Sequence, residues 1–211
     1  MCYTVHVVSL FDLPKDGQRQ LAKFGGACSV KISENNVVSN LYDAPVKMTA
    51  KEAIAAISKM FGRGFTSGGH IIVAKELIDW LGPKFSHAVV AHEEAHLLQS
   101  GNLAHIESEY MADLYACRKA GVENMIGALE RIRDPKWWKF ITKFRGQSYQ
   151  IRDVGETVYL EISDIIKNRI NYMRSMSSQD ADSVNIDWRK IVIGVAAVGA
   201  LGFGLFKLFK R

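Results

Sequence analysis

The sequence predicts an α+β domain that is followed by a single C-terminal transmembrane helix. Three features of the 211 residues lead to this prediction. Short β-type segments dominate the first 45 residues, helical patterns occupy most of residues 49–176, and a long apolar segment lies near the C-terminus. A hydrophobic fraction of 48% with 23% charged residues is typical of a folded domain with its own core.

The N-terminal segments predict a small sheet with one helix. The helix at residues 14–24 is closed by Gly25 and Gly26, because glycine is favoured where a helix ends. Turn-forming residues Glu34-Asn35-Asn36 separate two β-type segments and favour a hairpin there. The four predicted strands are CYTVHVV at residues 2–8, CSVKI at residues 28–32, VVSNLY at residues 37–42 and HIIVA at residues 70–74.

The remaining elements are predicted to be helices. Thr49 and Glu52 form a capping box for the first of them, which ends at Gly62. The glycine-rich residues 62–69 lack the Gly-Lys-Ser/Thr ending of a phosphate loop and predict a turn. Further helices are predicted at residues 75–82, from Pro83 to Gly101-Asn102, and at residues 104–120, 122–134, 136–146 and 159–176.

The predicted helix at residues 136–146 has two interpretations. Trp137, Trp138, Ile141 and Phe144 fall on one face, while the basic residues fall mostly elsewhere. This segregation suits a helix that lies in a membrane interface, and it equally suits an ordinary helix whose apolar face packs on the core.

The C-terminal segment predicts a membrane anchor. Residues 191–206 form an uninterrupted apolar run of 16 residues, which gives a helix of roughly 24 Å. Trp188, Arg189 and Lys190 before the run, and basic residues after it, supply interfacial anchors. Ala196, Ala200 and Gly204 form a small-residue seam that favours helix–helix self-association in lipid. We therefore expect a domain at residues 1–176, a polar linker at residues 177–188 and an anchor at residues 189–211. The alternative for this run is a buried core helix.

Charge and cysteine content narrow the function classes. The net charge of +5 comes entirely from the basic residues after residue 188, so the body has equal numbers of acidic and basic side chains. A neutral body argues against nucleic-acid binding. The three cysteines form no CxxC pair, and the N-terminus lacks a secretory signal, so we expect a single-pass membrane protein whose domain faces the cytoplasm.

The segment AHEEAHLLQSGNLAHIESEYMAD, residues 91–113, contains the candidate metal ligands and the candidate general base. His92 and His96 lie one helical turn apart, so both imidazoles can bind one zinc ion, and Glu93 lies beside them as a general base. A metzincin would need Gly and His where this chain has Gln99 and Asn102. Glu109, on the next helix, is the predicted third ligand, and Asp113 is the predicted carboxylate partner of a ligand histidine.

At these residues the chain resembles the gluzincin metallopeptidases, whose signature is HExxH followed by Glu-x-x-x-Asp on a later helix. EYMAD at residues 109–113 resembles most the CAAX-protease and HtpX-like membrane peptidases, and the likeness extends over about residues 69–174. It implies a zincin-like minimal metallopeptidase domain with one Zn²⁺, in which HIIVA lines the substrate cleft.

One departure from this family concerns the group that stabilises the oxyanion. A His-Pro pair precedes an Arg-Ile pair by six residues in the family, whereas this chain has Ser163-Asp164 before Arg169-Ile170. The candidate oxyanion stabilisers are therefore His105, Tyr110, Arg169 and Tyr172.

The sequence thus predicts a membrane-anchored zinc metallopeptidase that hydrolyses peptide bonds through a metal-activated water. Its expected partners are a peptide or protein substrate and, through residues 189–211, membrane lipid. The alternative is a non-enzymatic membrane or virion assembly component that retains a degenerate zincin fold.

Overall fold

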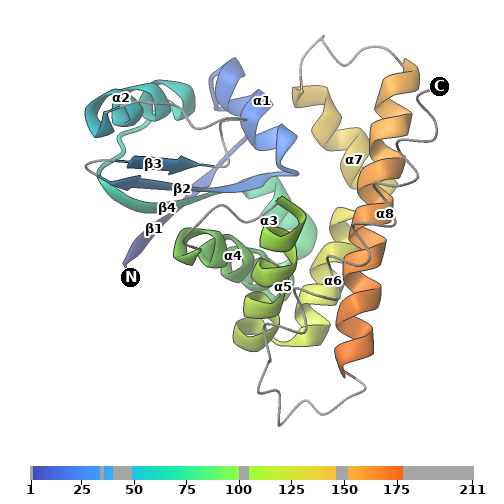
Figure 1. Ribbon diagram of the computed structural model, residues 1–211. Coiled ribbons are helices and arrows are strands. Elements are labelled where there is room, and N and C mark those ends of the chain that lie inside the picture. The colour runs from blue at the N-terminus through green and yellow to red at the C-terminus, as the bar shows by residue number, and fades with distance from the viewer. Residues whose placement is uncertain (1, 34–35, 40–48, 100–104, 146–151, 178–211) are drawn as a thin grey trace, which may run out of the picture.

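The computed structural model describes residues 2–33, 36–39, 49–99, 105–145 and 152–177 (Figure 1). For residues 36–39, 105–106, 152–162 and 176–177 it describes the backbone alone. The strands are β1 (Tyr3–Val8), β2 (Ala27–Ser33), β3 (Asn36–Ser39) and β4 (Gly68–Ala74). The helices are α1 (Lys15–Lys23), α2 (Ala50–Phe61), α3 (Lys75–Leu81), α4 (Pro83–Leu98), α5 (His105–Ala120), α6 (Val122–Ile132), α7 (Pro135–Ile141), the 3-10 helix η1 (Thr142–Phe144) and α8 (Arg152–Ser177).

The four strands form one sheet in the order β1-β4-β2-β3. β1 runs parallel to β4, with Tyr3 opposite Gly69, while β2 runs antiparallel to both β4 and β3. The predicted hairpin of β2 and β3 is confirmed, with Ser33 opposite Asn36. β4 is an interior strand, and six of its seven residues are buried, which is why HIIVA is a continuous apolar run.

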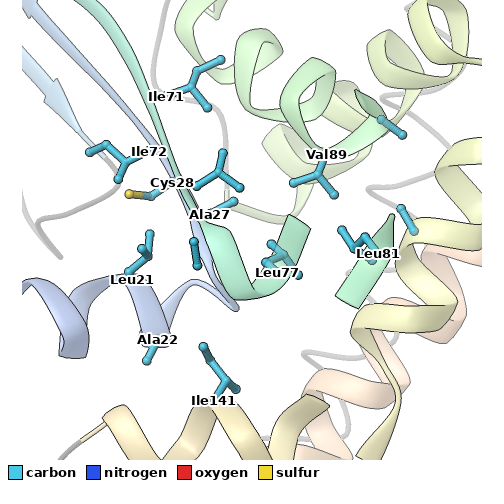
Figure 2. Close-up of a cluster of buried hydrophobic side chains, with 14 of the residues drawn as sticks. Leu21, Ala22, Ala27, Cys28, Ile71, Ile72, Leu77, Leu81, Val89 and Ile141 are labelled. Atoms are coloured by element: carbon cyan, nitrogen blue, oxygen red, sulfur yellow. The ribbon is translucent and has the colours of Figure 1, made fainter. Parts of the chain in front are cut away.

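Helices cover both faces of the sheet. Figure 1 shows α1 and α2 on one side and α4 on the other, with α5 and α6 on the side of α4 that is away from the sheet. Side chains from α1, β2, β4, α3, α4 and α7 meet in one core, as Figure 2 shows for Leu21, Ile72, Leu77, Val89 and Ile141. The described residues are therefore a mixed α+β structure with a single main core.

Helix α4 occupies the centre of this arrangement. It contacts α5 most extensively, and it also contacts α3, α6, β2 and β4. Gly82, at φ 77°, turns the chain out of α3, and Pro83 begins α4. Proline is favoured at this position because the backbone N–H that it lacks would have no partner within the helix. Because neighbours surround α4, its buried residues lie on more than one side and include His92 and Glu93.

Three helix predictions needed correction. Helix α4 ends at Leu98, before the predicted end at Gly101-Asn102, and Gln99 is already extended. The last helix begins at Arg152, seven residues before the predicted Tyr159. The Trp-rich helix ends at Ile141 and continues as η1, and Trp137, Trp138 and Ile141 are all buried. The core-facing interpretation of this helix is thus confirmed for its tryptophans.

The predicted linker and membrane anchor, residues 177–188 and 189–211, lie outside the described residues apart from Ser177, the last residue of α8. Within the part of the chain that the structure describes, no helix has both the length and the apolar character needed to cross a bilayer.

Candidate metal centre

Two imidazoles from α4 and one carboxylate from α5 meet between these helices. His92 and His96 lie one turn apart, with ring centroids 4.8 Å apart, so both rings project from the same side of α4. Glu109 projects from α5, which packs closely on α4 because Ala112 and Ala116 are small and fully buried. Ligand atoms of His92, His96 and Glu109 all lie within 4.8 Å of one another.

The spacing of the donor atoms matches a tetrahedral metal site. His92 Nε2 and His96 Nε2 are 3.1 Å apart. Glu109 Oε2 lies 3.4 Å from His92 Nε2, and Glu109 Oε1 lies 3.3 Å from His96 Nε2. Tetrahedral coordination with bonds of about 2.0–2.1 Å would separate neighbouring donor atoms by about 3.3 Å. The three donor groups therefore already stand at the separation that a zinc ion requires.

A buried carboxylate faces the other nitrogen of His92. Asp113, 1% exposed at its side chain, brings Oδ1 to 2.9 Å from His92 Nδ1. The distance is that of a hydrogen bond, although the ring N–H direction is not well aligned with the oxygen. A carboxylate at Nδ1 leaves Nε2 free to bind a metal, which is the usual arrangement for a ligand histidine.

Arg169 of α8 holds both carboxylates of this cluster. Its Nε and Nη2 donate to the two oxygens of Asp113, both at 2.6 Å, and Nη1 lies 2.9 Å from Glu109 Oε2. This fork geometry fixes the orientation of Asp113 and restrains Glu109. Arg169 was predicted only as an oxyanion stabiliser, whereas in the structure it contacts Glu109, the candidate metal ligand, and Asp113, the carboxylate that faces His92.

His96 is oriented by groups at the junction of α4 and α5. His96 Nδ1 lies 3.1 Å from Ser108 Oγ and 3.3 Å from Gln99 Oε1. The Gln99 amide donates to the Ser108 carbonyl at 2.9 Å, and the Ser108 hydroxyl donates to Gln99 Oε1. Sequence reasoning missed Gln99 and Ser108, because polar residues near a helix end carry no distinctive pattern.

The electrostatic field of the cluster favours a cation. Burial lowers the pKa of His92, but Asp113 and Glu109 outweigh it and raise this pKa to about 10. Burial raises the pKa of Glu109, whereas hydrogen bonds from the two histidines and the charges of His92 and Arg169 hold it well below 4.5. When both histidines are neutral, as metal binding requires, Glu93, Glu109, Asp113 and Arg169 together have a formal charge of minus two, which a divalent cation would neutralise.

Glu93 is buried beside the cluster without being part of it. Glu93 is only 8% exposed, and its Oε2 atom has no hydrogen-bond partner among the described residues. A buried carboxylate oxygen without a hydrogen-bond partner is costly, so it requires a reason beyond packing. Glu93 lines the same cavity as His92, His96 and Glu109, which places it where a water molecule or a substrate would contact it.

That cavity has a volume of about 480 Å³ and is lined by residues of α1, β2 and the helices α3 to α8. Its strand residues, Ala27 and Cys28, belong to β2, not to β4 as the resemblance implied. The volume is within the range of small-molecule and peptide side-chain sites. The cluster therefore opens onto a space large enough for a ligand.

The structure separates the four predicted oxyanion stabilisers. Arg169 lines the cavity, whereas Tyr110 and Tyr172 are absent from its lining and stack edge to face at 5.2 Å. The side chain of His105 lies outside the described side chains. Of the three described candidates, only Arg169 is in place to contact a ligand in the cavity.

Glu94, which follows Glu93 in α4, is mostly buried and is not a solvated surface charge. Its side chain is 12% exposed and accepts hydrogen bonds from the hydroxyls of Tyr3 and Tyr115, each at 2.9 Å, and from Lys119. Glu94 therefore connects β1, α4 and α5. The signal available in the sequence was weak, since the three partners lie 21 to 91 residues away.

Comparisons with known proteins give no relative for this chain: no protein-family model, curated protein or solved structure matches it significantly.

Proposed function

We propose that this protein is a zinc-dependent metallopeptidase in which His92, His96 and Glu109 bind one Zn²⁺ and Glu93 is the general base. The observation that carries the proposal is the position of Glu93. Its buried carboxylate, with Oε2 unpartnered among the described residues, lines the cavity that the three donor groups also line. HExxH and Glu109 supply the donor set that zinc prefers in hydrolases.

The residues present fit a zinc ion in both geometry and charge. The donor atoms are 3.1 to 3.4 Å apart, and the Nε2 atoms of both histidines point at the same space. Asp113 and Ser108 occupy the Nδ1 sides, so each ring is held in one orientation. A bound zinc ion would polarise the peptide carbonyl and lower the pKa of a water molecule.

In this proposal Glu93 moves the proton. Its carboxylate accepts a proton from the attacking water and then donates this proton to the nitrogen of the leaving group. The peptide C–N bond therefore breaks to release a neutral amine and not an amide anion. General acid–base catalysis of this kind contributes about 10²- to 10⁴-fold to a rate. Arg169 holds Glu109 and Asp113 in place, and its position in the cavity lining makes it our preferred candidate for contact with the substrate oxygen.

The test combines metal analysis with peptide cleavage. We expect the purified protein to contain one zinc per chain and to cleave members of a peptide library, with cleavage abolished by a chelator and restored by zinc. Glu93→Gln should keep the zinc and lose at least about 100-fold in cleavage rate. Glu107→Gln, a carboxylate on α5 outside the cluster, is the matched control and should retain both.

Equal cleavage by the wild type and Glu93→Gln would refute the assignment of the base. A folded protein without stoichiometric zinc and without cleavage would instead support the non-enzymatic assembly component.

Membrane attachment through residues 189–211, with helix–helix self-association there, is also part of the proposal. It is tested separately by fractionating cells that express the full chain and a chain ending at residue 177.

A further inference from the structure

The cavity beside the metal cluster is lined mainly by apolar side chains that the proposed reaction does not use. The polar lining comes chiefly from α4, α5 and α8, where His92, Glu93, His96, Glu109 and Arg169 lie. The apolar lining comes from Phe24 at the end of α1 and from side chains of β2, α3, α4, α6, α7 and α8. A cavity of about 480 Å³ is much larger than the reacting atoms need.

Exposure along the lining shows where the cavity opens. Met125 and Leu129 of α6 and Ile166 of α8 are each at most 4% exposed, so they lie inside the protein. Ile165 is 44% exposed, Lys23 is exposed and Phe24 is half-buried. The exposed edge of the cavity therefore includes the end of α1 and Ile165 of α8, and the apolar interior consists of the buried residues.

Such a space favours an apolar ligand over water. Water molecules against an apolar wall have few hydrogen-bond partners, so replacing them with an apolar group gains free energy. Because Glu93 and the two histidines line the same cavity, a group held there is connected by only a few bonds to the atoms that react. A side chain held in the cavity would therefore belong to a residue next to the cleaved bond.

We propose that the cavity is the specificity pocket for a bulky apolar side chain, such as Leu, Met, Phe or Trp, in the residue that flanks the scissile peptide bond. Leu129 and Ile166 are the specificity-determining residues, since both are buried in the lining and come from different helices. The inference rests on the proposed peptidase function and adds the class of substrate to it.

Each buried methylene in an apolar pocket changes kcat/KM by about 10-fold or more. The wild-type full chain should therefore cleave peptides with Leu or Phe at this position at least about 100-fold more efficiently than the same peptides with Ala. The measurement is a peptide library that varies the residues on both sides of the cleaved bond, with products identified by mass spectrometry.

Leu129→Phe narrows the cavity and should reduce kcat/KM for Phe and Trp peptides at least about 10-fold more than for Ala peptides. Leu114→Phe, an equally buried Leu-to-Phe change on α5 outside the cavity lining, should leave this ratio unchanged. Circular dichroism establishes that each variant is folded. If Leu129→Phe does not fold, Ile166→Phe provides the same comparison.

A binding measurement separates failure of this inference from failure of the proposed function. Glu93→Gln, titrated with a Phe peptide and its Ala counterpart and followed by calorimetry, should bind the Phe peptide at least about 10-fold more tightly. Chelator-sensitive cleavage with no preference for bulky apolar residues would overturn the inference and leave the peptidase standing. If no peptide is cleaved, the peptidase fails, and equal binding of the Phe and Ala peptides would then overturn the pocket as well.

Discussion

Arg169→Met should destabilise the metal-free protein by about 3–5 kcal/mol, because it leaves two buried carboxylates without their cation. Arg169 is 8% exposed. Its guanidinium donates two hydrogen bonds of 2.6 Å to Asp113 and lies 2.9 Å from Glu109. Methionine has a similar length and restores the apolar contacts without restoring the charge. A loss of this size is a large share of the roughly 5–15 kcal/mol by which domains are stable.

The assay is urea unfolding followed by circular dichroism at pH 7, with a chelator present so that no metal compensates for the lost charge. Arg174→Met is the matched control on the same helix, because Arg174 pairs with Glu130 where both side chains are about half exposed. An exposed pair contributes at most about 1 kcal/mol, so this variant should change little.

A double-mutant cycle tests the reasoning further. Asp113→Asn removes the carboxylate that is most buried, so combining it with Arg169→Met should cost less than the sum of the two single changes, by about 1–3 kcal/mol. If Arg169→Met and Arg174→Met cost the same, and the cycle shows no coupling, then the cluster is hydrated and the account of a buried charge network is wrong.

Three further predictions concern a residue of the candidate site, a residue beside it on α4 and a residue of α1. Ser108→Ala removes the hydroxyl that faces His96 Nδ1 and should weaken zinc binding about 10- to 100-fold, measured by competition with a chelator; an unchanged affinity would show that Gln99 alone orients the ring. For Glu94, burial raises the pKa but hydrogen bonds from Lys119, Tyr115 and Tyr3 lower it more, so its stabilisation is present above pH 4.5 and is lost as the pH falls through the depressed value. The stability difference between wild type and Glu94→Gln in urea unfolding should therefore shrink below pH 4.5, and a difference independent of pH would contradict this reasoning. Gly17→Ala should cost about 1–3 kcal/mol despite the higher helix propensity of alanine, because its Cβ would lie 2.3 Å from the Met60 carbonyl oxygen, whereas Gly64→Ala, with open space around it, should be tolerated in thermal unfolding.

Local signals in the sequence predicted the elements that local interactions determine. Thr49 and Glu52 cap α2 as expected, with the Glu52 carboxylate 2.8 Å from the Thr49 backbone nitrogen, and Gly62 ends that helix at φ 63°. The start of α8 was misplaced because Gly155 and the β-branched residues near it have low helix propensity, so their sequence suggests a loop. The strand order β1-β4-β2-β3 depends on contacts between distant segments, which no short pattern encodes.

The candidate site likewise has one part that local spacing predicts and another part that depends on contacts between distant segments. The clustering of His92, His96 and Glu109 followed from helical spacing and one turn, and the structure brings their donor atoms together as predicted. The pairing of Arg169 with Asp113 joins residues 56 positions apart and depends on how α8 packs on the other helices. One signal was nevertheless present: Arg169 lies on a face that otherwise buries Ile166, Ile170 and Met173, and a cation on an apolar face requires a buried anion.

The burial of these charges is itself an argument for function. A buried ion network contributes little net stability, and apolar residues of similar size at the same positions would be at least as stabilising. Helix α4 is surrounded by α3, α5, α6 and the sheet, so its folding would be served best by leucine or alanine at positions 92, 93 and 96. The chain instead places two imidazoles and a carboxylate there, beside an apolar cavity of about 480 Å³ whose low polarity strengthens every electrostatic interaction within it. The same apolar surroundings raise the free-energy cost of the bare carboxylates and increase the attraction of a divalent cation. The proposed binding of a divalent cation would therefore offset the cost of burying these residues.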